Sequence, residues 1–205
     1  MSSCSESRWG DTSKRRIIVV TGTPGTGKTT LAKMLAREIG AEYLSLGKYV
    51  SDHRLFSGVD RKRKTQVVDV IRTRGRMRRF TKSDAPPLIV DTHHPEGIVR
   101  NNVTALVFVL RCDPTVLIRR LQRKKWYQEK IRENVMAEIL DYCFINAQSY
   151  YASEKVVQLD TSWSSVKSSV KAAKNILSGT KPPSLRVDWL RKLEKDPSLS
   201  KYLRC

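Results

Sequence analysis

The sequence predicts an α/β fold in which helices flank a doubly wound, five-stranded parallel sheet. Unbroken apolar runs rich in β-branched residues occur at 17–20, 88–90 and 105–110, and such runs are typical of strands buried on both faces. Segments with apolar residues at helical spacing separate these runs. Because strands that alternate with helices form a parallel sheet, we expect a ligand at the carboxyl ends of the strands.

The predicted elements follow one another closely along the 205 residues. The first strand, 17–20, leads into a helix whose buried stripe recurs every four residues from Leu31, and Gly40 is expected to end it. Asp113 and Pro114 predict the N-cap and the first residue of another helix. Further strands are expected at 41–46, 88–91, 105–110 and 155–159, and further helices at 131–151 and 162–177.

The segment between the first strand and the first helix carries a motif that predicts a ligand. It reads GTPGTGKT and matches the pattern G-x-x-x-x-G-K-[ST] over residues 22–29, which defines a P-loop. Its glycines let successive backbone N–H groups face a phosphate, and the helix adds the positive end of its dipole. We expect Lys28 to reach the β- and γ-phosphates of a nucleotide and the Thr29 hydroxyl to bind Mg²⁺. The alternative is a glycine-rich turn without a ligand.

A second candidate site element follows the strand at 88–91. Asp91 ends this strand, where a carboxylate could organise Mg²⁺, although a strand can also end in Asp only to form its turn. His93 lies two residues further on, so its side chain points the same way as Asp91 in an extended chain. We expect His93 to orient a water or to contact an acceptor oxygen, and His94 to be a surface residue.

Residues 47–83 form a strongly basic insertion. Val67, Val68, Val70 and Ile71 predict a helix of about three turns before Gly75. We expect short helices that present arginines from one apolar seam. These arginines would hold an acceptor substrate or the phosphates of a nucleic acid, or would only form a solvated face.

A second basic stretch, 122–132, predicts a short lid. Arg123 and Lys124 follow a predicted helix and precede an aromatic pair, Trp126 and Tyr127. Such a hairpin can close over a nucleotide, exclude water and bring a cation to the phosphates. The alternative is a helix turn with lysines that extend into solvent.

The net charge of +19 makes a nucleic acid, or an assembly built on one, an expected neighbour, with a generally basic surface as the alternative. The four cysteines are scattered, so neither a zinc site nor a disulfide framework is expected. No apolar run approaches the length of a membrane span. We therefore expect no membrane partner and a cytoplasmic location, or a nuclear one in a eukaryotic source.

Three regions are predicted. Residues 1–15 lack an apolar core and are expected to be a disordered basic tail, not a signal peptide. Residues 16–179 are expected to form one P-loop domain of the size of a small kinase. Residues 180–205 are expected to form a helical extension that docks on that domain, with packing on a partner as the alternative.

Over residues 17–177 the sequence resembles the adenylate kinase isoenzyme 6-type proteins, in an archaeal-like form. The resemblance rests on four stretches: GTPGTGKTT at 22–30, Asp91-Thr92-His93 as a D-x-H motif, LVFVLR at 106–111 and KIRENVMAEI at 130–139. It implies a nucleoside-monophosphate-kinase-like fold with a very short lid, and a role in small-subunit ribosome maturation. The family's arginine and glycine before the lid aromatic stand here as Lys124 and Lys125, so Arg123 or Arg132 could supply the cation instead.

The resemblance also implies roles for individual residues. It implies a Mg²⁺-linked role for Asp91 and a catalytic role for His93, which would organise water or phosphate. It implies contacts with ATP at Gly25, Gly27, Lys28, Thr29 and Thr30.

The expected activity is transfer of the γ-phosphoryl group of ATP to AMP with Mg²⁺, together with ATP hydrolysis, in maturation of small-subunit rRNA. One alternative is a ribosome-assembly ATPase with little kinase activity that contacts pre-rRNA or a small-subunit ribosomal protein. Another is a kinase of a different small acceptor, such as cytidylate, a shikimate-like alcohol or a coenzyme precursor.

Overall fold

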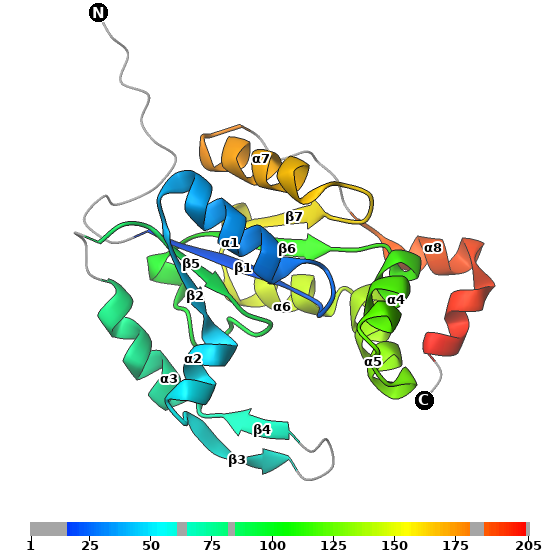
Figure 1. Ribbon diagram of the computed structural model, residues 1–205, viewed down its shortest axis with the longest axis horizontal. Coiled ribbons are helices and arrows are strands. Elements are labelled where there is room, and N and C mark those ends of the chain that lie inside the picture. Colours follow the sequence, from blue (N-terminus) through cyan, green and yellow to red (C-terminus); the bar gives the residue numbers. More distant parts are fainter. Residues whose placement is uncertain (1–15, 61–64, 82–84, 181–186, 204–205) are drawn as a thin grey trace, which may run out of the picture.

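The computed structural model describes residues 16–60, 65–81, 85–180 and 187–203. At its centre is a five-stranded parallel sheet with the order β2-β5-β1-β6-β7 (Figure 1). The strands are β1 (Ile17–Gly22), β2 (Glu42–Ser45), β5 (Leu88–Asp91), β6 (Thr104–Arg111) and β7 (Val156–Asp160). The predicted fold class is therefore confirmed. The tail at 1–15 lies outside the described residues.

Helices cover both faces of this sheet, and the side chains of β1 show why its sequence is apolar throughout. Ile18 and Val20 pack with α1 (Lys28–Ile39) and α7 (Val166–Leu177) on one face. Ile17 and Val19 pack on the other face with α2 (Leu46–Asp52) and α6 (Tyr142–Tyr150). A strand buried on both faces carries no polar alternation.

Further helices connect or follow these elements along the chain. They are α3 (Val70–Met77), α4 (Pro114–Arg123), α5 (Gln128–Ile139) and α8 (Trp189–Lys195), with short 3₁₀ helices η1 (Arg78–Thr81), η2 (Asn101–Val103), η3 (Ser153–Lys155) and η4 (Pro197–Tyr202). Two predicted helix ends are confirmed. Gly40 ends α1 in the left-handed conformation, and Asp113 caps α4 with Pro114 in its first turn. No helix among the described residues has the length and apolar character that crossing a membrane requires.

The basic insertion folds differently from the prediction. Val67 and Val68 belong to strand β4 (Thr65–Val68), which pairs antiparallel with β3 (Phe56–Asp60) in a separate hairpin. The helix begins only after Asp69, because the Asp69 side chain accepts a hydrogen bond from the N–H of Arg72. It continues through Gly75, so the predicted end is also wrong.

Three other predicted boundaries change. The helix expected at 131–151 is two helices, α5 and α6, because Asp141 adopts a left-handed conformation with φ 56° between them. Ser45 caps α2 and so ends the strand expected at 41–46. Ser165 caps α7, which therefore starts later than residue 162.

The C-terminal segment, defined here as residues 187–203, packs against α4 and α5 (Figure 1). Leu199 is 1% exposed in a cluster with Leu117, Leu121 and Ile131. The extension thus docks on its own domain, as the sequence suggested.

Candidate nucleotide site

The P-loop connects β1 to α1, and two of its glycines pack closely against neighbouring elements. A Cβ atom at Gly22, where φ is 136°, would collide with the carbonyl oxygen of Leu110 in β6. A Cβ atom at Gly25 would lie 2.7 Å from Cδ1 of Leu117 and 2.9 Å from Cδ2 of Leu121. The glycines therefore let the loop approach both the neighbouring strand and α4.

Lys28 is held inside this loop. Its side chain is 5% exposed, and Nζ donates to the carbonyl oxygen of Thr23 at 3.0 Å. The same carbonyl accepts from Oγ1 of Thr26 at 2.8 Å. Burial lowers the pKa of Lys28 to about 8, although Asp91 opposes this effect. The result is a fixed, poorly hydrated cation at the first turn of α1.

Asp91 lies where β5 ends and receives two hydroxyl groups. Oγ1 of Thr29 donates to Oδ2 of Asp91 at 2.6 Å, and the hydroxyl of Tyr43 on β2 donates to the same oxygen at 3.0 Å. Burial and the charge of Asp91 raise the pKa of Tyr43 to about 12, so it remains a donor. The Thr29–Asp91 pair supplies the hard oxygen ligands that suit Mg²⁺. Among the described residues no cluster of three metal-ligating side chains forms, so an ion here would also need phosphate or water oxygens.

His93 stands beside the loop, as its spacing from Asp91 suggested. Its Nδ1 lies 3.4 Å from the carbonyl oxygen of Gly22, and its own carbonyl accepts from Oγ1 of Thr21 at 3.1 Å. Burial against the loop and the charge of Lys28 lower the pKa of His93 to about 4. The ring is therefore neutral at pH 7, although part of it is open to the cavity described next.

These residues line a cavity of about 770 Å³. The size is that of a small-molecule site. Its lining includes seven of the predicted site residues together with the lid lysine: Gly25, Gly27, Lys28, Thr29, Thr30, Asp91, His93 and Lys124. His94 also lines it and is an exposed residue, as the sequence suggested. Arg123, the other lid candidate, is not part of the lining.

The insertion supplies the far wall of the cavity with Asp60, Gln66, Val67, Val68 and Val70. None of its described arginines lines the cavity, so the expected arginine seam faces elsewhere. Arg74 and Arg78 instead line a separate cavity of about 70 Å³ together with Arg100. Arg74 and Arg78 therefore lie on a different surface of the insertion from the residues that form the cavity wall.

The lid is the turn between α4 and α5. Lys124 lies near enough to Lys28 that its charge also lowers the pKa of Lys28. Lys125 has φ 56°, a left-handed conformation, at the position where the resembling family has glycine. Trp126 closes the cavity on this side.

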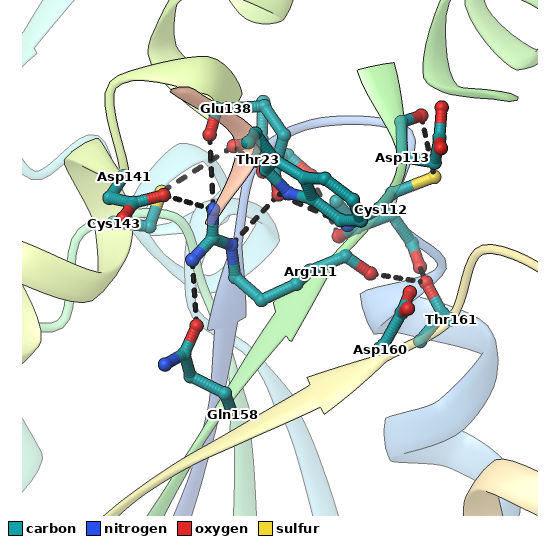
Figure 2. A network of polar contacts seen from close by, with 12 residues as sticks. Thr23, Arg111, Cys112, Asp113, Glu138, Asp141, Cys143, Gln158, Asp160 and Thr161 are labelled. Carbon is teal, nitrogen blue, oxygen red and sulfur yellow. Dashed lines mark hydrogen bonds and ion pairs between the residues drawn. The ribbon is translucent and has the colours of Figure 1, made fainter. Parts of the chain in front are cut away.

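Sequence reasoning missed a buried polar network behind the loop (Figure 2). Glu138 on α5, 2% exposed, accepts from Oγ1 of Thr23 at 2.6 Å and from Nε of Arg111 at 2.9 Å. Arg111 also pairs with Asp141 and donates to Gln158 at 2.7 Å. The sequence held one signal of this network, which is the charged residue Arg111 at the end of an apolar strand. Tyr43 was also missed.

Glu96 is a further cavity residue that no motif indicated. Its Oε1 is buried without a hydrogen-bond partner, while the residue lines the cavity beside His94. Burial raises the pKa of its carboxyl group. An unsatisfied buried oxygen in a cavity wall is suited to accept a hydrogen bond from a ligand.

A five-stranded parallel sheet with a P-loop in its first crossover, next to this cavity, defines the class of P-loop nucleotide-binding proteins. Residues 18–141 match a family model described as AAA domain. A protein from Sulfurisphaera tokodaii that carries the provisional name adenylate kinase is 35% identical over 137 residues, which are 67% of this chain and 70% of that protein. One with the same name from Thermococcus kodakarensis is 33% identical over 175 residues, which are 84% and 92% of the two chains.

Shikimate kinase from Bacteroides thetaiotaomicron has a similar fold, with a TM-score of 0.55 at 18% identity over 80% of this chain and 98% of that chain. The chain belongs to the AAA-domain family of P-loop proteins, and the two proteins provisionally named adenylate kinase are among its relatives.

Proposed function

We propose that the protein transfers the γ-phosphoryl group of ATP to AMP, with Mg²⁺, and hydrolyses ATP at the same site. The observation that carries this proposal is the buried Lys28 beside the Thr29–Asp91 pair, at one end of a cavity whose far wall is the basic insertion. The names of the archaeal relatives support AMP as the acceptor.

The P-loop would bind the triphosphate. Lys28 would give its charge to the β- and γ-phosphates, and the backbone N–H groups of Gly25, Gly27 and Thr30 would donate to phosphate oxygens. Thr29 and Asp91 would hold Mg²⁺, with Asp91 kept in position by the hydroxyl of Tyr43. When bound, the ion would offset the negative charge of the phosphates.

The opposite side of the cavity would bind the acceptor. Gln66 offers an amide that can pair with a base edge, next to the apolar surface of Val68 and Val70. Lys124 would act as the lid cation, since it is the lid residue of the predicted pair that lines the cavity. His93, neutral at pH 7, can accept a proton from a water or orient an acceptor oxygen.

The test is an acceptor screen with Mg-ATP, comparing AMP, cytidylate and shikimate with an ATP-only control. We expect AMP to give the fastest formation of ADP. Lys28→Ala should lose both transfer and hydrolysis, because the loop then lacks its phosphate-binding cation. Lys171→Ala, at an exposed position on α7, is the matched control. Full turnover in Lys28→Ala would refute the site.

His93 separates the two activities. We expect His93→Ala to lose ATP hydrolysis while AMP-dependent formation of ADP continues, because AMP brings its own nucleophilic oxygen. His53→Ala, which also removes an exposed histidine ring, is the control. Equal loss of both activities would contradict this division of roles.

A second candidate function, a nucleotide-switched ATPase of ribosome assembly that contacts pre-rRNA or a small-subunit ribosomal protein, rests on the arginines outside the cavity. Arg74, Arg78 and Arg100 come together away from the nucleotide site, in a chain of net charge +19. We expect replacement of Arg74 and Arg78 by Gln to weaken RNA binding and to lower its salt dependence by about one charge per residue, with ADP formation unchanged. Arg37→Gln on exposed α1 surface is the control, and RNA binding equal to wild type would exclude this face.

A further inference from the structure

The C-terminal segment lies outside the cavity, yet it packs on α4 and α5, the two helices whose connecting turn lines the nucleotide site with Lys124 and Trp126. Leu199 inserts between α4 and α5, where it shares a cluster with Leu117, Leu121 and Ile131. Trp126, which lines the cavity, packs against the same cluster. The C-terminal segment and the lid therefore share one apolar core.

The apolar contact continues to the P-loop. Leu117 and Leu121 are the side chains that a methyl group at Gly25 would strike, at 2.7 Å and 2.9 Å. The leucines that bury Leu199 thus also border the loop backbone that curls around phosphate. Because packed interiors have few voids, a displacement of these leucines is felt at the loop.

A polar connection runs in parallel through Glu138 (Figure 2). Nε1 of Trp189 on α8 donates to Oε1 of Glu138 at 3.1 Å. The other carboxylate oxygen accepts from the hydroxyl of Thr23 at 2.6 Å. The carbonyl of Thr23 is the group to which Lys28 donates. One buried carboxylate therefore joins α8 to the residue that positions the phosphate-binding lysine.

A third connection holds the start of α4. Lys192 on α8 forms an ion pair with Oδ2 of Asp113. The other oxygen of Asp113 accepts from the N–H of Thr115 at 2.8 Å and so caps α4. Three independent contacts thus fix the C-terminal segment to elements that touch the P-loop.

We infer that the C-terminal segment is a positioning element of the P-loop and that Trp189 is its principal positioning residue. The inference rests on the proposed function, in that nucleotide binds at the loop. When the C-terminal segment is docked, it holds Glu138 and the α4 leucines against the P-loop. The affinity of the loop for nucleotide therefore depends on this docking. By thermodynamic reciprocity, bound nucleotide stabilises the docked segment to the same degree.

The main experiment compares Trp189→Phe with wild type in titrations with Mg-ADP, followed by calorimetry, and in steady-state kinetics. Phenylalanine keeps an aromatic ring but lacks the donor to Glu138. We expect the dissociation constant for Mg-ADP and the KM for ATP to rise about five- to tenfold, the effect of losing one hydrogen bond of ordinary net strength. The kcat should stay within about twofold of wild type, because the contact serves binding and not the chemical step.

Trp163→Phe is the matched control, since Trp163 is 74% exposed and the guanidinium of Arg119 lies over its ring. Unchanged affinity in Trp189→Phe would overturn the inference while leaving the proposed function intact. Wild type that fails to bind Mg-ADP would instead refute the proposed function, and the inference with it. A loss of kcat with unchanged KM would also contradict a positioning role.

A measurement on wild type alone makes the test independent of mutant stability. We expect hydrogen exchange of the amides of α8 to slow when Mg-ADP is added, because ligand and docking stabilise each other. Exchange in α7, which lacks these three contacts and contributes no residue to the cavity lining, provides the internal reference. Identical exchange of α8 with and without Mg-ADP would contradict the coupling.

Discussion

Lys28 destabilises the nucleotide-free protein while it prepares the site. In the unfolded chain its pKa is 10.5, whereas burial lowers it to about 8 in the folded state. Between these values the unfolded state binds more protons, so stability rises with pH there, and below pH 8 the full cost of the buried charge is present. The buried charge is retained because binding of a phosphate group requires a cation at this position.

We therefore expect Lys28→Met to raise the free energy of unfolding at pH 7 by about 1–3 kcal/mol, with nucleotide binding abolished. Urea unfolding without nucleotide measures the change. Lys171→Met, at an exposed position, should leave stability nearly unchanged. A less stable Lys28→Met protein would show that the bond to Thr23 outweighs the cost of burial.

Tyr43 is a residue whose removal should show in metal dependence. Its hydroxyl shares Oδ2 of Asp91 with Thr29, so it is the remaining donor to that oxygen if Thr29 turns toward an ion. We expect Tyr43→Phe to raise the Mg²⁺ concentration for half-maximal activity about threefold. Tyr127→Phe, at a residue 84% exposed, is the control, and an unchanged Mg²⁺ requirement would contradict this role.

Residues on the P-loop and after β5 were predictable because each belongs to a short local pattern. Asp91 and His93 come within two positions of each other, and the loop spans eight consecutive residues. Tyr43 and Glu138 were not predictable, since their partners lie 48 and 115 positions away in the chain. Only the folded sheet brings these side chains to the loop.

At the scale of elements, the insertion shows where apolar spacing misleads. Val67, Val68, Val70 and Ile71 satisfy a helical pattern, but β-branched residues also favour a strand. Pairing of β4 with β3 decides between the two for the valines at 67 and 68, and the cap at Asp69 assigns the others to α3. The break between α5 and α6 escaped prediction because it depends on the distant partner of Asp141, Arg111.

Arg111 joins β6, α5 and that break, so its loss should be severe. It is 1% exposed and pairs with Glu138 and Asp141. We expect Arg111→Met to destabilise the protein by about 3–5 kcal/mol, because it leaves Glu138 buried and unpaired. The corresponding fall in Tm is about 10 °C, measured by thermal unfolding. Arg119→Met, on exposed surface of α4, is the control.

The pH dependence of that variant provides a second check. Without Arg111, the buried carboxylate of Glu138 loses the opposite charge that offsets the cost of its burial. The destabilisation should therefore be largest at neutral pH and should decrease in acid. A loss of stability that stays constant on acidification would point to packing alone.

At the scale of the whole molecule, the sheet and its helices could be read from the sequence because strands buried on both faces have no polar alternation. The net charge of +19 could be read as well, but not its distribution. The insertion residues that line the nucleotide cavity include no described arginine, whereas Arg74, Arg78 and Arg100 line a separate small cavity. Electrostatic attraction of a large anion and recognition of a small acceptor can therefore act on different sides of one insertion.

The left-handed backbone at Lys125 has an evolutionary consequence. A non-glycine residue in this conformation costs about 1 kcal/mol, but glycine would lose a similar amount through its greater freedom in the unfolded chain. The two residues are thus almost equivalent for folding. The lid could exchange glycine for lysine without a compensating change elsewhere. Selection can therefore adjust the charge of this turn to the molecules that approach the lid.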